Sequence, residues 1–387
     1  MLSFNNTEIS FSGKTNKDLN RSYWLFKMVA NPTFVSIGKS LTTFAISMHL
    51  PIKGIIKATI FKQFCGGETI EECSTAIQEL GKYNVGTILD YSVEGKESEH
   101  DFDACMYETI ETIKKAKNDQ HIPFSVFKVT GLARFAILEK VSAKIALTAE
   151  EHLEYERIKN RVNAICKAAH DSGVPIFIDA EESWIQDAVD TLTFELMRKY
   201  NKTNAVVYST PQMYRHDRLE FCKRSLQDAI EHNYILGLKP VRGAYMEKER
   251  KRAEEMNYPS PIQKDKEATD KDYDAVLEFS INNIEKIALC AATHNEKSSL
   301  FLAEELHKRN IPHNHPHISF SQLYGMSDQI TYNLAKGGYN ATKYLPYGPV
   351  KDVIPYLIRR AQENKSVSGQ MSRELGLLYK EIKRRGL

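Results

Sequence analysis

The chain has 387 residues, more than the roughly 250 that one (β/α)8 barrel needs, so its length allows one large domain with an additional region. Its 52 Lys and Arg side chains nearly balance 50 Asp and Glu side chains, and so small a net charge argues against a nucleic-acid partner. The six cysteines show no CxxC spacing, which argues against a zinc site and a disulfide framework and is typical of a reducing compartment.

Residues 1–83 are predicted to form a helical N-terminal region. Apolar residues recur there at helical spacing, for example around Trp24, until Gly66–Gly67 interrupts the pattern. Acidic residues near the start, Glu8 and Asp18, argue against a signal or transit peptide. The longest uncharged run in this part of the chain is too short to span a membrane. We therefore expect a cytoplasmic protein without a transmembrane segment.

Residues 84–387 are predicted to form an α/β fold, a (βα)8 TIM-type barrel that includes the C-terminal helices. Short apolar or β-branched runs alternate there with helix-like segments, which is typical of parallel strands joined by crossover helices. A doubly wound open sheet is the competing fold, but neither GxGxxG nor GxxxxGK[ST] occurs. The predicted strands are Gly86–Tyr91, Phe124–Thr130, Pro175–Asp179, Ala205–Ser209, Ile235–Val241, Ile287–Thr293, Ile318–Gln322 and Ala341–Leu345.

The C-terminal ends of these strands are unusually polar. Chemistry in such barrels takes place at those ends, so the polar residues predict a binding site there. His313, His315 and His317 alternate before the seventh strand, but they have no carboxylate nearby and we expect no metal site. The polar residues at the strand ends are Asp90, Lys128, Asp179, Gln212, Lys239, Arg242, Thr293, His294, Asn295, Gln322 and Tyr344.

A helix that Pro355 opens is predicted after the last strand. Ile354, Leu357, Ile358 and Ala361 form its apolar stripe, while Tyr356, Arg359, Arg360 and Glu363 repeat the same spacing on one flank. Guanidinium groups bind carboxylates through two hydrogen bonds, so the two arginines are candidates for holding an amino-acid carboxylate. By itself, however, an arginine pair on an amphipathic helix also fits a solvated face.

The flank residues belong to a longer pattern that resembles the proline dehydrogenase family. Its C-terminal signature is similar to Tyr344, Pro346, Gly348, Tyr356, Leu357, Arg359, Arg360, Glu363 and Asn364. Its earlier motifs resemble Lys128 after the second strand, Asp179-Ala180-Glu181 after the third, Val241, Gly243, Ala244 and Tyr245 after the fifth, and Thr293-His294-Asn295 after the sixth. The resemblance covers roughly residues 85–365.

The resemblance implies an FAD enzyme that oxidises L-proline to Δ1-pyrroline-5-carboxylate by hydride transfer to flavin N5 and passes the electrons to a quinone. It implies catalytic roles for Lys128, Asp179 and Lys239, with Asp179 bonded to Tyr344. It implies substrate contacts from Lys128, Tyr344, Tyr356, Arg359 and Arg360. It implies flavin contacts from Gln212, Lys239, Val241, Gly243, Ala244, Thr293, His294, Asn295 and Glu363.

One residue departs from the family pattern, because many bacterial members have arginine where this chain has Lys239. Lysine keeps the charge and loses the planar fork, so we expect a point-charge contact with the flavin. Hydroxyproline dehydrogenase is the nearest alternative activity, and Tyr344 argues against it. A lyase that uses Lys128 as a Schiff-base amine and a non-catalytic amino-acid binder also remain open.

The ends of the sequence suggest further partners. A separate pyrroline-5-carboxylate dehydrogenase is expected downstream, because the chain has no room for a second catalytic module. Residues 375–387 combine apolar and basic side chains, which fits either packing against the barrel or peripheral contact with an anionic inner-membrane surface. The charged stretch 246–274 fits either a cover over the flavin or a solvated helix pair.

Overall fold

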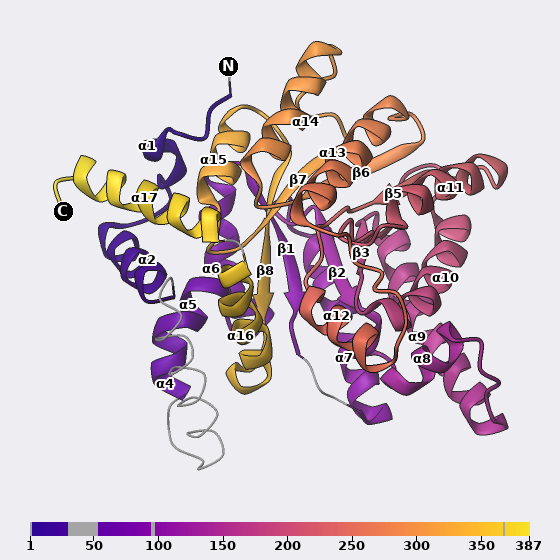
Figure 1. The fold of residues 1–387 in the computed structure, drawn as a ribbon. Helices are drawn as coiled ribbons and strands as arrows, with labels where there is room; N and C mark the ends of the chain where they lie inside the picture. The colour runs from indigo at the N-terminus through magenta and orange to yellow at the C-terminus, as the bar shows by residue number, and fades with distance from the viewer. Residues whose placement is uncertain (1, 30–52, 94–96, 367) are drawn as a thin grey trace. The chain divides into compact units, whose positions relative to one another are not determined.

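Eight strands form a closed barrel in the order of the chain in the computed structural model, which describes residues 2–29, 53–93, 97–366 and 368–387 (Figure 1). All eight predicted strands are confirmed, and the fold is the predicted α/β barrel. The strands are β1 Val85–Tyr91, β2 Phe124–Lys128, β3 Ile176–Asp179, β4 Val207–Ser209, β5 Leu236–Leu238, β6 Ile287–Ala292, β7 Ile318–Leu323 and β8 Ala341–Tyr347.

Five strands (β2 to β6) are shorter than predicted, and β2 and β5 end early for local reasons. β2 ends at Lys128 because the next residues, Val129–Gly131, turn into a 3-10 helix. β5 ends at Leu238, two residues before Pro240, which cannot donate a hydrogen bond to a ladder. Pairing resumes beyond the proline, where the N–H of Val241 donates to Pro211 O at 3.0 Å.

Helices follow the strands in alternation. The longest, α9, begins at a capping box between Thr148 and Glu151 and ends at Gly173, whose φ of +66° suits glycine. These helices are α7 Glu99–Lys117, α8 Phe135–Ser142, α9 Ala149–Ser172, α10 Ser183–Tyr200, α11 Arg218–Glu231, α12 Met246–Glu255, α13 Lys266–Asn282, α14 Glu296–Lys308, α15 Asp328–Lys336, α16 Val350–Ser366 and α17 Ser368–Arg384. The charged stretch 246–274 thus contains α12 and the start of α13, a helix pair.

The described residues before β1 are helical, as the sequence predicts. They form α1 Thr7–Ser10, α2 Asn16–Val29, α4 Lys53–Ile56, a π-helix Lys57–Phe61, α5 Lys62–Phe64 and α6 Ile70–Gly81. By its contacts the chain divides into two compact units, one of residues 1–94, 294–296 and 321–387 and the other of residues 95–293 and 297–320. The division into domains at residue 83 stays a prediction.

The C-terminal helix α17 belongs to the first unit. Its side chains Leu377, Leu378 and Ile382 are buried in one apolar cluster with Leu19 and Leu25 of α2. Burial on this scale stabilises a helix more than its intrinsic propensity does. The apolar part of the 375–387 pattern is therefore used in packing on the N-terminal helices. Within the described ranges, no helix combines the length and apolar character needed to cross a bilayer.

The loop after β7 is tied to the N-terminal helices at Gly325. Its φ is +76°, and a Cβ built there would lie 2.0 Å from Gln63 O of α5. Gln63 Nε2 donates to Gly325 O at 2.9 Å, and Ser22 Oγ donates to Gln63 Oε1 at 2.9 Å. The sequence therefore needs glycine here for two separate reasons, backbone conformation and close approach.

We expect Gly325→Ala to lower the free energy of unfolding by roughly 3 kcal/mol or more, because strain and a backbone clash add. Gly338→Ala is the matched control: its φ is +80°, but nothing lies within 4 Å of the added Cβ. The free energy of unfolding of that control should fall by only about 1 kcal/mol. Urea unfolding of both variants checks the prediction, and equal losses would contradict it.

Candidate functional site

Three of the predicted site residues meet in the second unit as a chain of charges. Lys128 and Asp179 are register partners at the ends of β2 and β3, and Lys239 directly follows β5. Lys239 Nζ donates to Asp179 Oδ1, while Lys128 Nζ lies 3.9 Å from Asp179 Oδ2. The three residues predicted to be catalytic are therefore brought together by the barrel.

An aromatic layer forms the floor beneath this ion chain. Lys239 Nζ lies 4.9 Å from the centre of the Phe177 ring, in cation–π geometry. Phe177 stacks on Phe124 at 4.6 Å and meets Tyr208 edge-on at 5.2 Å. All three rings are buried, so the Lys239 ammonium group contacts an apolar surface.

The two lysines of this chain differ in exposure and in their distance from Asp179. The Lys239 side chain is 5% exposed and the Lys128 side chain 20% exposed, and Lys239 makes the shorter contact with Asp179. Lys128 is therefore the more accessible of the two cations, which makes this lysine the candidate for contact with an anionic ligand.

The loop after β5 carries four predicted flavin contacts, Lys239, Val241, Gly243 and Ala244. Gly243 has a φ of +124°, and an added Cβ would lie 2.6 Å from the Tyr214 ring. Glycine is therefore required at this position by the protein's own packing. Tyr214 occupies the space that a side chain at residue 243 would need.

Arg242 in the same loop fixes the end of β6, a role that the sequence did not predict. Its Nε donates to Asp270 at 2.6 Å, Nη1 to Thr293 Oγ1 at 2.6 Å and Nη2 to Ser298 Oγ at 2.9 Å. Its guanidinium also lies 4.3 Å from the Tyr273 ring centre. The partners are far apart in sequence, so no spacing pattern could have shown this clamp on Thr293.

Gln212 is held by the residues that follow β3. Its Nε2 donates to Glu181 O at 2.6 Å, which leaves Oε1 as the acceptor end of the amide. Glu181 entered the sequence argument only as part of a motif, yet it is 5% exposed and burial raises its pKa to about 7. Thr130 lowers that pKa by hydrogen bonding, and the charge of Lys128 also lowers it.

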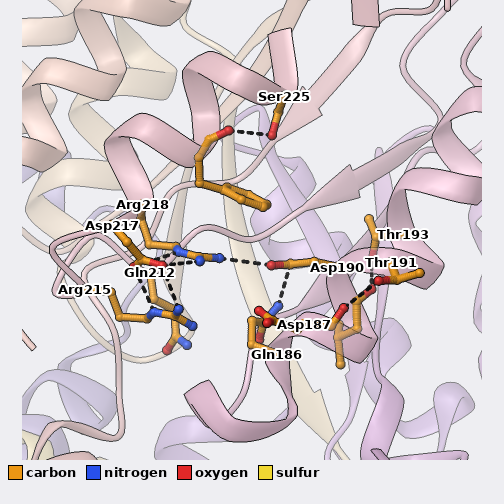
Figure 2. Close-up of polar contacts among 12 residues, drawn as sticks. Gln186, Asp187, Asp190, Thr191, Thr193, Gln212, Arg215, Asp217, Arg218 and Ser225 are labelled. Atoms are coloured by element: carbon orange, nitrogen blue, oxygen red, sulfur yellow. Dashed lines mark hydrogen bonds and ion pairs between the residues drawn. The ribbon is translucent and has the colours of Figure 1, made fainter. Parts of the chain in front are cut away.

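A neighbouring network on α10 and α11 is shown in Figure 2. Gln186 Nε2 donates to Asp190 Oδ1 at 2.8 Å, and Arg218 Nη1 donates to Asp190 Oδ2 at 3.0 Å. Asp217 pairs with both Arg215 and Arg218, whose charges hold its pKa below the ordinary range although burial alone would raise it. Two arginines balance two carboxylates, so this network stabilises the two helices.

In the first unit, His294 is held by a serine. His294 Nδ1 lies 2.8 Å from Ser327 Oγ, and the N–H of Ser327 donates to Glu374 Oε1 of α17 at 3.0 Å. Burial raises the pKa of Glu374 to about 8. Ser327 and Glu374 were missed by sequence reasoning, because neither belongs to a motif and they lie far from residue 294 in the chain.

β8 places two adjacent residues on opposite faces. Tyr344 is 8% exposed, and its carbonyl accepts from the N–H of Tyr324 at 2.8 Å. Lys343 is 1% exposed and pairs with Asp328 at 2.8 Å, and Asp328 also pairs with Lys14 at 3.1 Å. Because adjacent strand residues alternate between faces, Tyr344 and the buried Lys343–Asp328 ion pair lie on opposite faces of β8.

The helix after β8 differs from its prediction in where it begins. It starts at Val350 and contains Pro355 in its interior, so the prediction that Pro355 opens it is wrong. Pro349 is the residue that starts it, since its carbonyl accepts from the N–H groups of Asp352 and Val353. Val353, Tyr356 and Leu357 are buried in the apolar cluster of α17. The predicted stripe is therefore only partly right: Tyr356, predicted on the arginine flank, is buried in this cluster, while Ile354 is half-buried.

Of the two arginines of this helix, the structure describes the side chain of Arg359 only. Arg359 is half-buried. The side chains of Arg360 and Glu363, and that of Ala361 in the predicted apolar stripe, lie outside the described residues. Their predicted roles stay predictions, as does the bond between Tyr344 and Asp179. Among the residues that the structure does describe, no group of three His, Cys, Asp or Glu is arranged to hold a metal ion.

Comparison with known proteins identifies the family. The family model described as proline dehydrogenase matches residues 73–373, which is most of the chain. The chain belongs to the proline dehydrogenase family. The resemblance drawn from the strand-end motifs is confirmed.

Several relatives in this family are similar over most of the chain. The mitochondrial proline dehydrogenase 1 of Dictyostelium discoideum is 35% identical, over 88% of this chain and 67% of its own length. The carbapenem antibiotics biosynthesis protein CarD of Pectobacterium carotovorum subsp. carotovorum is 34% identical, over 93% of this chain and 94% of its own. The hydroxyproline dehydrogenase of Xenopus laevis is 28% identical, over 99% of this chain and 90% of its own length.

Solved structures show the same fold. Proline utilization A from Bdellovibrio bacteriovorus superposes with a TM-score of 0.73 at 20% identity, over 92% of this chain. The present chain spans 38% of that protein's length. This likeness shows the barrel fold.

We expect Asp179→Asn to lower the free energy of unfolding at neutral pH by roughly 3 kcal/mol, because it leaves the buried Lys239 cation without its partner. Adding Lys239→Met should recover most of that loss, since the double variant has no unpaired buried charge. Urea unfolding of wild type, both single variants and the double variant measures the coupling. A double variant that loses the sum of the two single losses would contradict the ion pair.

Proposed function

We propose that this proline dehydrogenase family member oxidises L-proline to Δ1-pyrroline-5-carboxylate, using FAD. The observation that carries the proposal is the Lys128–Asp179–Lys239 ion chain at the strand ends, above an apolar aromatic floor. A cation beside an apolar surface suits a substrate with one carboxylate and an aliphatic ring. Family membership makes proline that substrate.

From the family resemblance, we propose Lys128, Arg359 and Arg360 as the ligands of the proline carboxylate. Lys128 supplies a point charge, and an arginine adds two parallel donors that fix the carboxylate plane. Tyr344 of β8, with Tyr356 of α16, limits the space around the ring. Holding the carboxylate in this way turns the ring carbon next to nitrogen in a defined direction, so orientation supplies most of the rate enhancement.

The residues after β4, β5 and β6 fit a flavin by the donor groups they offer. Lys239 supplies a buried cation and Gln212 Oε1 an acceptor. Arg242 holds Thr293 in place, while His294 and Asn295 follow it. Bound FAD supplies the hydride acceptor and passes the electrons to a quinone. The protein orients the substrate towards it and keeps its own charges fixed.

Lys239 has a second role in this proposal. Because Asp179 neutralises it, the lysine keeps a fixed position that a free lysine side chain would lose. A lysine in this position acts as a point charge near the flavin, without the two-pronged contact that arginine would make. Asp179 thereby positions both cations, Lys128 for the substrate and Lys239 for the cofactor.

The surroundings of the enzyme follow from the same chemistry. The cyclic imine product calls for a separate dehydrogenase acting on pyrroline-5-carboxylate. A quinone acceptor places the protein at a bilayer, and we propose a cytoplasmic protein in peripheral contact with the inner membrane. Tyr379, Lys380 and Lys383 of α17 are exposed and available for that contact. Sedimentation with anionic vesicles tests it.

The purified full chain should contain FAD and should reduce an electron-accepting dye when L-proline is added, without NAD. Trapping the cyclic imine with an aromatic amine identifies the product. trans-4-Hydroxy-L-proline should react far more slowly, because Tyr344 occupies the space beside the ring. A protein that binds no flavin and forms no imine would reject the proposal, and faster turnover of hydroxyproline would redirect it to that substrate.

Arg359→Met should raise the proline KM by about one hundredfold or more, the loss expected for a charged hydrogen bond to substrate, with flavin content unchanged. Lys351→Met is the matched control, because Lys351 is an exposed cation on the same helix. That variant should keep the wild-type KM. Steady-state kinetics with measured flavin content decides between them, and equal KM values for the two variants would remove Arg359 from the site.

A further inference from the structure

A second buried carboxylate lies beside the ion chain, and the function proposed above leaves it without a role. Glu181 stands two residues beyond Asp179, and Thr130 two residues beyond Lys128. The Thr130 N–H donates to Glu181 Oε1 at 3.1 Å, and the Thr130 hydroxyl donates to Oε2. Because Lys128 and Asp179 are register partners, these bonds continue the β2–β3 pairing past the last ladder residues.

The main chain of Glu181 is held as firmly as its side chain. Its N–H donates to Gln186 Oε1 of α10 at 3.0 Å, and its carbonyl accepts from Gln212 Nε2 at 2.6 Å. Gln186 is fixed in turn by Asp190, in the network of Figure 2. Three separate parts of the barrel therefore converge on one acidic residue that is 5% exposed.

We propose that Glu181 is a positioning residue for the substrate carboxylate: it fixes the end of β2 that carries Lys128, and it takes up a proton when a carboxylate binds there. This inference rests on the proposed function, because it uses Lys128 as the carboxylate ligand. Glu181 itself does not touch the substrate in this account. It acts through Thr130 and through its charge.

The electrostatics give the sign of the effect. Burial raises the pKa of Glu181 to about 7 and the nearby charge of Glu182 raises it as well, while Thr130 and Lys128 lower it. A bound carboxylate adds negative charge near Lys128 and raises this pKa further. By reciprocity, a carboxylate must then bind more tightly when Glu181 is protonated, below neutral pH, than when it is ionised.

The other acidic groups that the structure describes near Glu181 each have an ion-pair or hydrogen-bond partner. They are Asp179, paired with Lys239 of the β5 loop, Glu182, paired with Lys248 of α12, Asp190, paired with Arg218 of α11, and Glu249 of α12, which accepts from Ser183.

Calorimetric binding of cyclopentanecarboxylate to the flavin-loaded full chain tests the inference. This ligand keeps the ring and carboxylate of proline and has no amine, so only the protein titrates near neutral pH. We expect its Kd to rise roughly fivefold between about pH 6 and about pH 8 in wild type. In Glu181→Gln, which keeps the size and an acceptor for Thr130, the Kd should not change with pH.

Thr130 supplies a matched pair of variants. Thr130→Val removes the hydroxyl donor that favours ionised Glu181, so the midpoint of the pH dependence should move upward. Thr130→Ser keeps the donor and should keep the wild-type midpoint. A wild-type pH dependence in Glu181→Gln, equal midpoints for the Val and Ser variants, or no binding to wild type would overturn the inference.

The same data separate this inference from the proposed function. A chain that binds cyclopentanecarboxylate with a Glu181-dependent pH profile, yet does not oxidise proline, would keep the positioning role and reject the activity. A chain that oxidises proline, but whose carboxylate binding does not depend on Glu181, would keep the activity and reject the positioning role.

Discussion

A single carboxylate, Asp179, organises the candidate site. It neutralises the buried Lys239 and lies within 3.9 Å of Lys128, so two cations from β2 and the β5 loop are placed by one anion from β3. A buried cation without a partner would cost several kcal/mol, or would lose its proton. The pairing therefore keeps positive charge fixed at an apolar surface, as the proposed binding of a substrate carboxylate and a flavin requires.

The structure around this carboxylate keeps the strand ends in place. Glu181 joins the extensions of β2, β3 and β4, and Arg242 ties the β5 loop to Thr293 after β6. Tyr214 packs against Gly243 and fixes the same loop from below. These contacts are of three kinds. Glu181 accepts hydrogen bonds from a neighbouring strand end, Arg242 donates to three acceptors, and the Tyr214 ring packs where a side chain at residue 243 would lie. The chemistry depends on orientation, so the support must be rigid.

Much of the fold could be predicted from the sequence, because short apolar runs indicate buried strands and the segments with helical spacing between them indicate the helices that join the strands. All eight strands were found, and β2 and β5 were predicted to extend too far because a local turn at Val129–Gly131 and the proline Pro240 end the ladder. The start of α16 was misplaced because Pro355 is tolerated inside the helix, while Pro349 supplies the first accepting carbonyl.

The candidate site was predicted less completely than the fold. Strand-end position and family motifs identified Lys128, Asp179 and Lys239, which the structure brings together. The supporting residues Arg242, Ser327 and Glu374 could not be assigned roles, since their partners lie far away in sequence and only the tertiary fold joins them. Glu181 stood in a motif, but its buried state is a property of the folded barrel.

The central claim is that these side chains present one ring carbon of proline, the one next to nitrogen and away from the carboxylate, to the flavin. Anaerobic rapid mixing of the flavin-loaded protein with L-proline carrying deuterium at that carbon tests it most directly. The account predicts bleaching of the flavin that is slower than with unlabelled proline, and no slowing when deuterium is placed at the carbon that bears the carboxylate. The opposite pattern, or no bleaching by either compound, would contradict it.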